Sequence, residues 1–512
     1  MKQAPTPPSA LVIFGITGNL AQRMLLPALY YLEKEQLLPE MFAIVGIFRR
    51  DPDLNAILGE ASDQIESGGD SVDPAVLSRL KARLHTVKMD STNPEHFKLL
   101  AAKLSELDEA AGAKLAHLFY LAIPPNIFRD VIGNLAKVGL NRTHAGTHAS
   151  RILVEKPFGD DLASAQALIE FMSGTFEEDQ IFRIDHYLAK ETAQNILTFR
   201  FNNPLVEGFW SRQFIDHIQI TAIEKIGIQG RAAFYENIGA LRDFVQSHLI
   251  QLMALVMMEY PENLRAEAIH KEKLLLLESI EPIAAKHVED VAVRGQYEGY
   301  RAEVGNAASN VETFAALKLE VANSRWGGVP VFLRTGKAMA TKATEIVVVF
   351  KDRSRRELSD NQLIIRIQPN EGISLKLLAK KPGFSNELQP VQMEFCYSGT
   401  FDGHQPDAYQ RVLMDALRGD RSLFATSDEV LASWRLLQPV LDAWKTSAEP
   451  PASYAQGSHG PAAGDTLAKN YGSHWLNNDV HVCASHPAPA SAHESGDPLQ
   501  NDIQPPEAHS VA

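Results

Sequence analysis

The sequence predicts two globular domains, an α/β domain of the Rossmann type followed by a larger α+β domain. Three observations support this prediction. The 512 residues exceed the usual size of one domain, and a composition of 45% hydrophobic and 22% charged residues is typical of a soluble globular protein. Strand-like and helix-like segments alternate in the first part of the chain, whereas strand-like segments follow one another closely in the second.

Residues 1–185 have the alternating pattern. Apolar runs at 11–14, 43–48, 118–123 and 151–154 have the length of strands, and the segments 20–38, 73–84 and 95–107 have helical spacing. Parallel strands need crossover connections of this length. The first domain is therefore expected to be a doubly wound parallel sheet with helices on both faces.

Residues 186–479 are expected to form the second domain. Apolar runs at 311–322, 329–334, 345–350, 363–368 and 373–379 are separated only by short Gly, Pro or Asn interruptions, which favours a large, mainly antiparallel sheet. Helices at 239–258 and 408–417 would cover one face of that sheet. The tail at 480–512 is rich in Pro, His, Ala and Ser, and we expect it to be disordered.

Charge and cysteine content limit the partners. A formal net charge of −14 argues against nucleic acid, and any anionic ligand would need locally concentrated cations. The most apolar stretch, 249–258, is shorter than the roughly 20 residues of a membrane span, and no export signal is evident. Cys396 and Cys483 are too few for a disulfide framework or a cysteine zinc site, so we expect a cytoplasmic protein without a metal.

A glycine-containing turn joins the first strand to the first helix. Its residues are Gly15, Ile16, Thr17, Gly18, Asn19 and Leu20. Glycines here let the backbone approach a pyrophosphate, and the helix N-terminus offers free N–H groups. The third glycine of the full fingerprint is absent, so a bare connecting turn is the alternative.

Arg49 and Arg50 follow the second strand directly. At this site a carboxylate would bind a ribose 2′-hydroxyl, whereas arginine suits a 2′-phosphate, so NADP is favoured over NAD. Asp51 stands close enough to leave use of NAD open as well. A solvated strand end is the structural alternative.

Chemically active side chains are concentrated after the fourth strand and at 183–191. Lys156 directly follows the strand and would point at the ligand edge of a parallel sheet. Asp185, His186, Tyr187 and Lys190 lie within a few residues, and His186 and Lys190 could face one anion from a helix. A salt-bridged surface loop is the alternative.

Two further clusters occur in the second domain. Asp243 and His248 precede an apolar helix, where a satisfied core histidine is the alternative explanation. Lys337 and Lys342 supply two cations at a strand end and the loop after it, where they could equally form a solvated face.

These motifs together resemble the glucose-6-phosphate dehydrogenase family, in the family's order. The segments that carry the resemblance are Gly15–Ala21, Glu155–Gly159, Arg183–Glu191, Gly239–His248, Arg334–Lys337 and the C-terminal segments around Asp407–Tyr409, Asp415–Asp420, Asp428–Glu429 and Tyr454–Pro461. The resemblance covers the chain from about residue 10 to about Trp475.

The resemblance implies oxidation of C1 of β-D-glucose 6-phosphate to 6-phospho-D-glucono-1,5-lactone with hydride transfer to NADP⁺, the first oxidative step of the pentose phosphate pathway. It implies His248 as general base with Asp185 as its carboxylate partner, and a homodimer or homotetramer. The implied substrate-binding residues are Lys156, His186, Tyr187, Lys190, Glu224, Asp243, Lys337 and Lys342, and the implied cofactor-binding residues are Gly15, Thr17, Gly18, Asn19, Leu20, Arg49 and Lys156.

Four positions depart from the family pattern. Asn19, Met24, Ala189 and Ser247 stand where the family usually has Asp, Lys, Gly and Asn. Two other functions remain open: a sugar dehydrogenase of the glucose–fructose oxidoreductase type, which acts on unphosphorylated sugars, and a non-catalytic relative that binds NADPH. The cluster from Asp185 to Lys190 argues against the first, and the presence of Asp185, His248 and Lys156 argues against the second.

Overall fold

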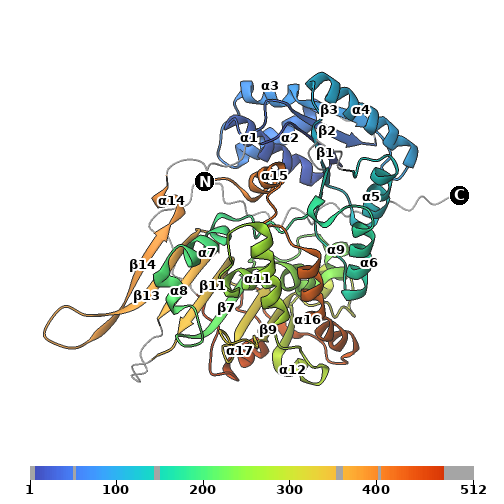
Figure 1. Cartoon of the computed structure of the whole chain (residues 1–512). Helices are drawn as coiled ribbons and strands as arrows, with labels where there is room; N and C mark the ends of the chain where they lie inside the picture. Colours follow the sequence, from blue (N-terminus) through green and yellow to red (C-terminus); the bar gives the residue numbers. More distant parts are fainter. Residues whose placement is uncertain (1–5, 50–52, 143–149, 353–360, 402–404, 478–512) are drawn as a thin grey trace. The chain divides into compact units, whose positions relative to one another are not determined.

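The computed structural model describes residues 6–49, 53–142, 150–352, 361–401 and 405–477 (Figure 1). The chain divides into two compact units. Within the described residues, the first contains the chain up to Ala189 together with Pro406–Ser427, and the second contains Lys190–Gln405 and residues 428–477. Arg50, Asp51 and the tail at 480–512 lie outside the described residues.

The first unit is built on a six-stranded parallel sheet with the strand order β3-β2-β1-β4-β5-β6. Its strands are β1 (Ser9–Phe14), β2 (Phe42–Phe48), β3 (Leu84–Lys88), β4 (Ala116–Leu121), β5 (Arg151–Val154) and β6 (Ile181–Arg183). Every residue of β1 and β2 is buried, as expected for strands covered on both faces. The predicted doubly wound parallel sheet is confirmed.

Helices connect these strands. They are η1 (Ala21–Leu25), α1 (Leu26–Lys34), α2 (Leu54–Ser67), α3 (Pro74–Ala82), η2 (Pro94–His96), α4 (Phe97–Ala111), η3 (Pro125–Ile127), α5 (Phe128–Lys137), α6 (Leu162–Ser173) and η4 (Glu178–Gln180). The side chains of Asp53, Asp73 and Asp161 accept hydrogen bonds from first-turn N–H groups, which explains where α2, α3 and α6 begin.

The prediction that a helix at 408–417 covers the large sheet was wrong. This segment forms α15 (Ala408–Arg418), but it packs against α1 and η1 of the first unit (Figure 1). Tyr409 and Leu413 join the core cluster that contains Leu11 and Ile13 of β1. The helix therefore does not cover the large sheet, because its apolar face is buried in the core of the parallel sheet.

The second unit is built on a nine-stranded sheet with the order β14-β13-β12-β11-β7-β10-β9-β8-β15. The strands are β7 (Ile215–Ile223), β8 (Ala292–Tyr297), β9 (Phe314–Leu319), β10 (Val331–Gly336), β11 (Ala343–Phe350), β12 (Gln362–Gln368), β13 (Gly372–Lys380), β14 (Leu388–Cys396) and β15 (Ala452–Tyr454). All neighbouring pairs are antiparallel except β7–β10 and β8–β15. The predicted α+β unit with a mainly antiparallel sheet is confirmed.

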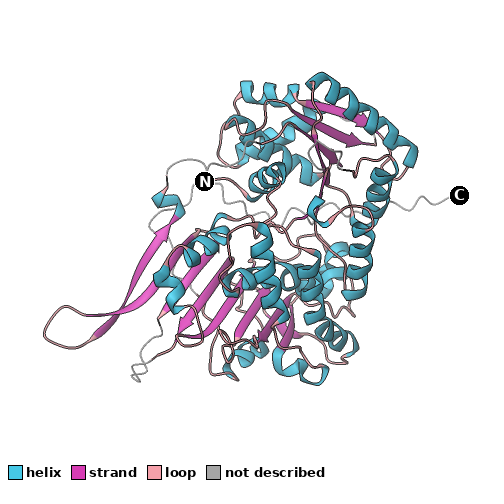
Figure 2. Cartoon of the chain, viewed as in Figure 1, coloured by secondary structure: helices cyan, strands magenta, loops and turns pink. Residues whose placement is uncertain are grey.

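Helices accompany this sheet in the second unit, and the strands run side by side in Figure 2. The helices are α7 (Glu191–Phe201), α8 (Pro204–Phe209), α9 (Ala232–Ala240), η5 (Leu241–Leu249), α10 (Ile250–Met257), α11 (Ala266–Glu278), η6 (Ala285–His287), α12 (Val288–Val291), α13 (Tyr300–Glu303), α14 (Tyr397–Thr400), α16 (Ser427–Thr446) and α17 (Ala462–Lys469). Helix η5 has π geometry, lies against β7, β9 and β10, and continues directly into α10.

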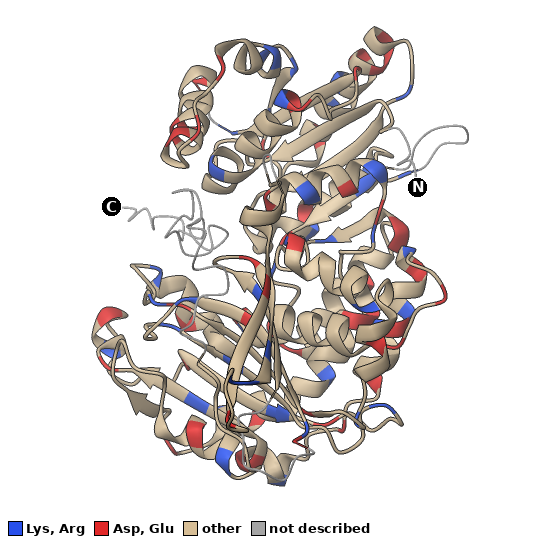
Figure 3. Ribbon diagram, turned by 90° about the vertical axis from the view of Figure 1, so that its left-hand side faces the viewer, with Lys and Arg blue, Asp and Glu red and all other residues tan. Residues whose placement is uncertain are grey.

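Charged residues of both signs are interspersed along the ribbon of each unit (Figure 3). The net charge of the chain therefore does not describe the charge at any one site. Among the helices within the described ranges, none combines the length and the apolar character that a membrane span requires.

Candidate active site

The glycine turn lies at the point where the strand order of the parallel sheet reverses. Strand β1 has β2 on one side and β4 on the other, and ligands of doubly wound sheets bind beyond the carboxyl ends of strands at this place. Gly15 has φ +87°, and a Cβ atom there would stand 2.3 Å from the carbonyl oxygen of Ala122, after β4. Only glycine fits this position, because any side chain would collide with the backbone that follows β4.

A helix starts at the end of this turn. The Gly18 N–H donates to the Gly15 carbonyl oxygen at 2.9 Å, and the helix runs from Asn19 through η1 to the end of α1. Its N-terminal N–H groups and its dipole favour a pyrophosphate. Leu20 is buried in the core cluster, so among the predicted cofactor-binding residues it could contribute only its backbone. The turn therefore fits a dinucleotide, with Thr17 and Gly18 nearest the helix start.

Arg49 follows β2 at the same edge of the sheet. Its side chain is 77% exposed, and its guanidinium lies 3.9 Å from a carboxylate oxygen of Asp90. The pKa of Asp90 is lowered, first by hydrogen bonds from Thr92 and also by the charge of Arg49. Because this ion pair is long and exposed, Arg49 keeps most of its hydrogen-bonding capacity for an anion.

The residues after β5 and β6 share that edge, because the two strands are parallel neighbours. Lys156 follows β5. The preceding residue, Glu155, accepts a hydrogen bond from the buried Tyr120 hydroxyl of β4. Burial, followed by the charge of Glu155, raises the pKa of Tyr120 well above its ordinary value. Tyr120 and Glu155 thus fix the start of the loop that presents Lys156.

Asp185, His186 and Tyr187 lie in the loop after β6. A carboxylate oxygen of Asp185 accepts the backbone N–H of Tyr187 at 3.0 Å, and Asp185 is buried. The rings of His186 and Tyr187 are 4.9 Å apart. The loop therefore has a fixed local geometry, and the structure brings these three residues to the same sheet edge as Lys156 and the glycine turn.

The second unit brings Glu224 and Lys337 together. Each follows one strand of the parallel pair β7–β10, so both chains leave the sheet at the same edge, and the Glu224 N–H donates to the Gly336 carbonyl oxygen at 2.9 Å. The Lys337 ammonium lies 2.5 Å from a Glu224 carboxylate oxygen and 3.8 Å from one of Asp243. Because Lys337 is only 2% exposed, this contact is a buried ion pair rather than a solvated face.

Two aromatic rings complete the surroundings of Lys337. Its ammonium is 5.2 Å from the ring centre of Tyr235 and 5.7 Å from that of Phe244. Cation–π contacts of this kind favour the charged form of a desolvated ammonium. We call Glu224, Tyr235, Asp243, Phe244 and Lys337 the Lys337 cluster. Its ammonium donors and carboxylate acceptors suit a polyhydroxylated ligand.

His248 lies on the same helix as Asp243 and is fully buried. In an α-helix, residues five apart point about 140° away from each other, since each residue turns the chain by about 100°. The π geometry of η5 widens the turn and brings positions 243 and 248 toward one face. The ring of Phe244 meets the His248 ring edge-on, with centroids 5.4 Å apart.

Two predicted lysines lie elsewhere in the second unit. Lys190 is the N-cap residue of α7, and Lys342 immediately precedes β11. Glu371 lies near Lys190, and burial raises the pKa of its carboxyl group even though the charge of Lys190 opposes the shift. Asp185 belongs to the first unit and His248 to the second, so their pairing stays a prediction.

Three of the residues that depart from the family pattern have defined contacts. Ala189 is buried in the core of the first unit, and Met24 packs against that core. The Ser247 hydroxyl donates to the carbonyl oxygen of Asp243 at 3.3 Å. Tyr235 and Phe244 were not predicted as site residues, because no sequence motif shows which rings will surround a buried lysine.

The fold and these residues define a class: an oxidoreductase with a nucleotide-binding Rossmann-type domain and a second α+β unit that carries the Lys337 cluster. Comparison with known families names the family. The glucose-6-phosphate dehydrogenase NAD binding domain matches residues 12–195, and the C-terminal domain of the same enzyme matches residues 197–476. The chain belongs to the glucose-6-phosphate dehydrogenase family, as its motifs indicated.

Individual relatives are similar over nearly the whole chain. The glucose-6-phosphate 1-dehydrogenase of Chlamydia pneumoniae is 41% identical over 92% of this chain and 96% of its own length, and that of Rhizobium meliloti is 40% identical over 92% and 98%. A crystal structure of the Mycobacterium avium enzyme has a TM-score of 0.78 at 36% identity, covering 92% of this chain and 99% of the other. A glucose-6-phosphate dehydrogenase in complex with its substrate glucose-6-phosphate has a TM-score of 0.85 at 31% identity, covering 93% and 100%.

Proposed function

We propose that this protein oxidises C1 of β-D-glucose 6-phosphate to 6-phospho-D-glucono-1,5-lactone with NADP⁺ as hydride acceptor, the first oxidative step of the pentose phosphate pathway. Family membership and the relative solved with glucose-6-phosphate support this proposal. The observation that carries it is the Lys337 cluster, buried beside the helix that also holds His248.

His248 is the proposed general base. A neutral imidazole can take the proton of the C1 hydroxyl while the hydride leaves C1, and such a base contributes about 10²–10⁴-fold to the rate. Asp185 is its proposed carboxylate partner, which would fix the tautomer and stabilise the imidazolium that forms. The burial of both side chains supports these roles, because charge interactions are stronger away from water.

The substrate would be held at two places. His186, Tyr187 and Lys190 would bind the 6-phosphate through a ring N–H, a hydroxyl and an ammonium. The hydroxyls of the sugar would contact Lys156, Glu224, Asp243, Lys337 and Lys342. Binding the remote phosphate supplies energy that positions the reacting carbon, so unphosphorylated glucose should be a poor substrate.

The proposed cofactor-binding residues are those of the glycine turn, Gly15 to Leu20, with Arg49 and Lys156. When bound, the nicotinamide ring of the cofactor supplies the acceptor for the hydride from C1. The turn and helix start would hold the pyrophosphate, and Arg49 would bind the 2′-phosphate, which favours NADP over NAD without excluding use of NAD. Cytoplasmic location and a homodimer or homotetramer remain predictions.

The test compares glucose 6-phosphate with glucose as electron donor, with NADPH formation followed by absorbance. The proposal predicts rapid, saturable reduction of NADP⁺ with glucose 6-phosphate and slow reduction with glucose. Equal rates with both sugars would remove the phosphate-binding assignment and favour the glucose–fructose oxidoreductase type. Binding of NADP⁺ without turnover of any sugar phosphate would favour the non-catalytic relative.

A further inference from the structure

The helix that carries Asp243 and His248 runs without a break from Leu241 to Met257. Every residue of its second half, α10, is buried, and Gln251 is the only polar side chain there. A helix that is apolar all round is buried, and this one has polar side-chain contacts along its length at Gln246 with Ser433 and at Gln251 with Glu429. Its end groups are important as well, because buried backbone carbonyls need hydrogen-bond donors.

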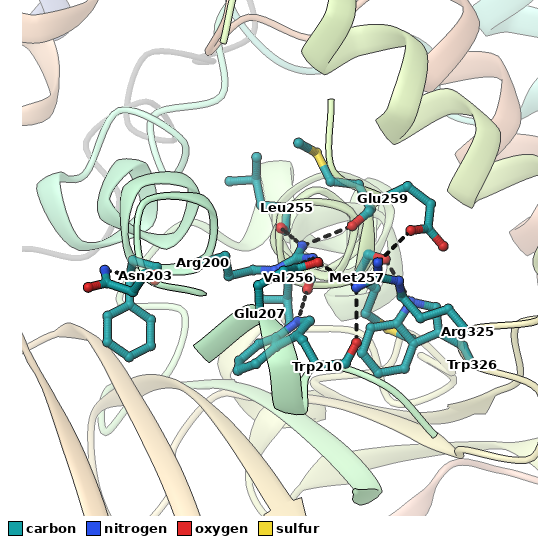
Figure 4. Close-up of polar contacts among 12 residues, drawn as sticks. Arg200, Asn203, Glu207, Trp210, Leu255, Val256, Met257, Glu259, Arg325 and Trp326 are labelled. Carbon is teal, nitrogen blue, oxygen red and sulfur yellow. Dashed lines mark hydrogen bonds and ion pairs between the residues drawn. The ribbon is translucent and has the colours of Figure 1, made fainter. Parts of the chain in front are cut away.

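Arg200 of α7 supplies donors at the C-terminal end. Its guanidinium donates to the carbonyl oxygens of Leu255 at 3.2 Å and Met258 at 2.9 Å (Figure 4). The Arg200 side chain is completely buried, and desolvation lowers its pKa to about 10. A buried cation at this place complements the negative end of the helix dipole.

Two tryptophans supply the donors for the carbonyls in between. The indole N–H of Trp210 donates to the Val256 carbonyl oxygen at 2.6 Å, and that of Trp326 donates to the Met257 carbonyl oxygen at 2.7 Å (Figure 4). Both rings are buried. The carbonyls of residues 255–258 thus each accept a hydrogen bond from a side chain on another element.

The donors are themselves held in place. Glu207 binds Arg200 at 3.1 Å and Arg325 at 2.6 Å, and Arg325 also binds Glu259 at 2.8 Å and the carbonyl oxygen of Trp210 at 3.0 Å (Figure 4). Two carboxylates and two guanidiniums therefore form one connected network around the helix end. Such a network limits the positions that Arg200 can adopt.

The N-terminal end is held by Glu312. A carboxylate oxygen of this buried residue accepts the backbone N–H of Leu241, the first residue of η5, at 3.0 Å. A Cβ atom at Gly239, where φ is +71°, would stand 2.5 Å from the same carboxylate. Glycine at 239 thus lets the carboxyl group reach the helix start.

The hydrogen bonds to these buried carbonyls stabilise the fold, whereas the ion pairs around Arg200 and Arg325 need not add to stability. Buried ion pairs carry a desolvation cost, and well-packed apolar residues in their place are often neutral or stabilising. What the contacts do fix is where the helix lies along its axis and which way it is rotated. A displacement of about 1 Å between reacting groups can slow a reaction about 10²-fold.

We propose that Arg200, Trp210, Trp326 and Glu312 are positioning residues, which set the axial position and rotation of helix 241–257 and thereby the places where His248 and Asp243 meet the substrate. The inference rests on the proposed function. It assigns these four residues no contact with substrate or cofactor.

The test uses the double variant Trp210→Phe/Trp326→Phe, which keeps a smaller aromatic ring at each position and removes both indole donors. Leu467→Ala, in the core cluster around Phe314, serves as the destabilised control. We expect kcat with glucose 6-phosphate to fall about 10- to 100-fold in the double variant, with the Kd for NADP⁺ unchanged. The control should lose thermal stability and keep its kcat. Arg200→Lys should keep more activity than Arg200→Met, because it retains a charged donor.

Hydrogen exchange of peptides covering 241–257 provides a readout that does not depend on activity. We expect faster exchange there in the double variant than in wild type. If exchange is unchanged, the contacts do not hold the helix, and the inference fails even where the wild type turns out to lack dehydrogenase activity. If exchange is faster but kcat of an active enzyme stays the same, the contacts serve stability only, and the positioning role is wrong.

Discussion

The glycine turn of the first unit and the Lys337 cluster of the second would bind their proposed ligands by opposite means. The turn offers the positive end of a helix dipole, and residues 15–20 carry no charged side chain. The Lys337 cluster instead pairs a buried ammonium with the buried carboxylate of Asp243 and the partly buried carboxylate of Glu224. One site depends on the shape of the backbone, and the other depends on buried charges.

This difference predicts which property each substitution will change. A change in the turn should weaken cofactor binding and leave the chemistry of the sugar alone. A change in the cluster or its helix should affect sugar binding or turnover and leave cofactor binding alone. Three substitutions test this separation, in order of decreasing effect on activity, and a fourth tests how a buried charge away from both sites affects stability.

The largest effect is expected from His248→Asn. The variant keeps a polar side chain of similar reach but loses the base, so kcat should fall by about 10²–10⁴-fold. The Kd of NADP⁺, measured by fluorescence titration, should stay close to that of wild type. Turnover close to wild type would remove His248 from its proposed role.

Lys337→Met should come next. It leaves the Glu224 and Asp243 carboxylates without their cation, and truncating one partner of a buried charge pair costs about 2–5 kcal/mol. We expect kcat/KM for glucose 6-phosphate to fall about 30-fold or more. Lys318→Met is the matched control, since Lys318 is also buried, paired with Glu320 and 4.0 Å from the Tyr471 ring centre. A loss of kcat/KM as large in the control would mean that Lys337 acts through stability.

Gly15→Ala should act on the cofactor. The added methyl group meets the Ala122 carbonyl and forces a left-handed backbone on alanine, at a cost of about 1–3 kcal/mol. We expect the Kd of NADP⁺ to rise about tenfold, with sugar specificity retained. Gly112→Ala separates the two causes, because Gly112 also has a positive φ, +62°, but has no atom within 4 Å of the added Cβ. Equal losses of affinity in both variants would contradict the close approach at Gly15.

Glu429→Gln should change stability with pH rather than activity at neutral pH. Glu429 is buried against Lys273 at 2.9 Å and His270 at 2.9 Å, and it accepts a hydrogen bond from Gln251 of α10 at 3.3 Å. Burial by itself raises the pKa of Glu429, but Lys273 and His270 outweigh it and lower the pKa from 4.5 to about 2.

The direction of the pH dependence follows from the unfolded and folded pKa values of Glu429. A carboxyl group with a lowered pKa stabilises the fold above the unfolded value of 4.5 and loses that contribution as the pH falls toward about 2. The contribution is about 3 kcal/mol. Urea unfolding of wild type between pH 5 and 2 should show this loss, and Glu429→Gln should show a smaller slope from a lower starting stability. Parallel slopes would contradict the lowered pKa.

Local sequence patterns predicted the parallel sheet and its glycine turn well. The apolar runs at 11–14, 43–48 and 151–154 match β1, β2 and β5, and the glycine turn between β1 and its helix lies at the switch point. These features depend on residues close in sequence, so the sequence shows them directly. The return of α15 to the first unit depends on long-range packing and was missed.

The surroundings of the Lys337 cluster were only partly predicted, because they too depend on long-range packing. Strand β7 was missed because Asp216, His217 and Gln219 interrupt its apolar pattern, although Gln219 is buried and donates to the His474 carbonyl oxygen at 2.7 Å. Without β7, the parallel neighbour that places Glu224 beside Lys337 was not visible. The π geometry of η5 and the rings around Lys337 likewise arise from packing between distant segments.

The central claim is that a backbone site for a phosphorylated dinucleotide and a buried charge site for a sugar phosphate serve one reaction. Steady-state kinetics on glucose 6-phosphate, with NADP⁺ and NAD⁺ measured side by side, test it most directly. The account predicts saturable reduction of NADP⁺, with kcat/KM higher than for NAD⁺ because Arg49 binds the 2′-phosphate. Absence of reduction of either cofactor by glucose 6-phosphate would contradict it.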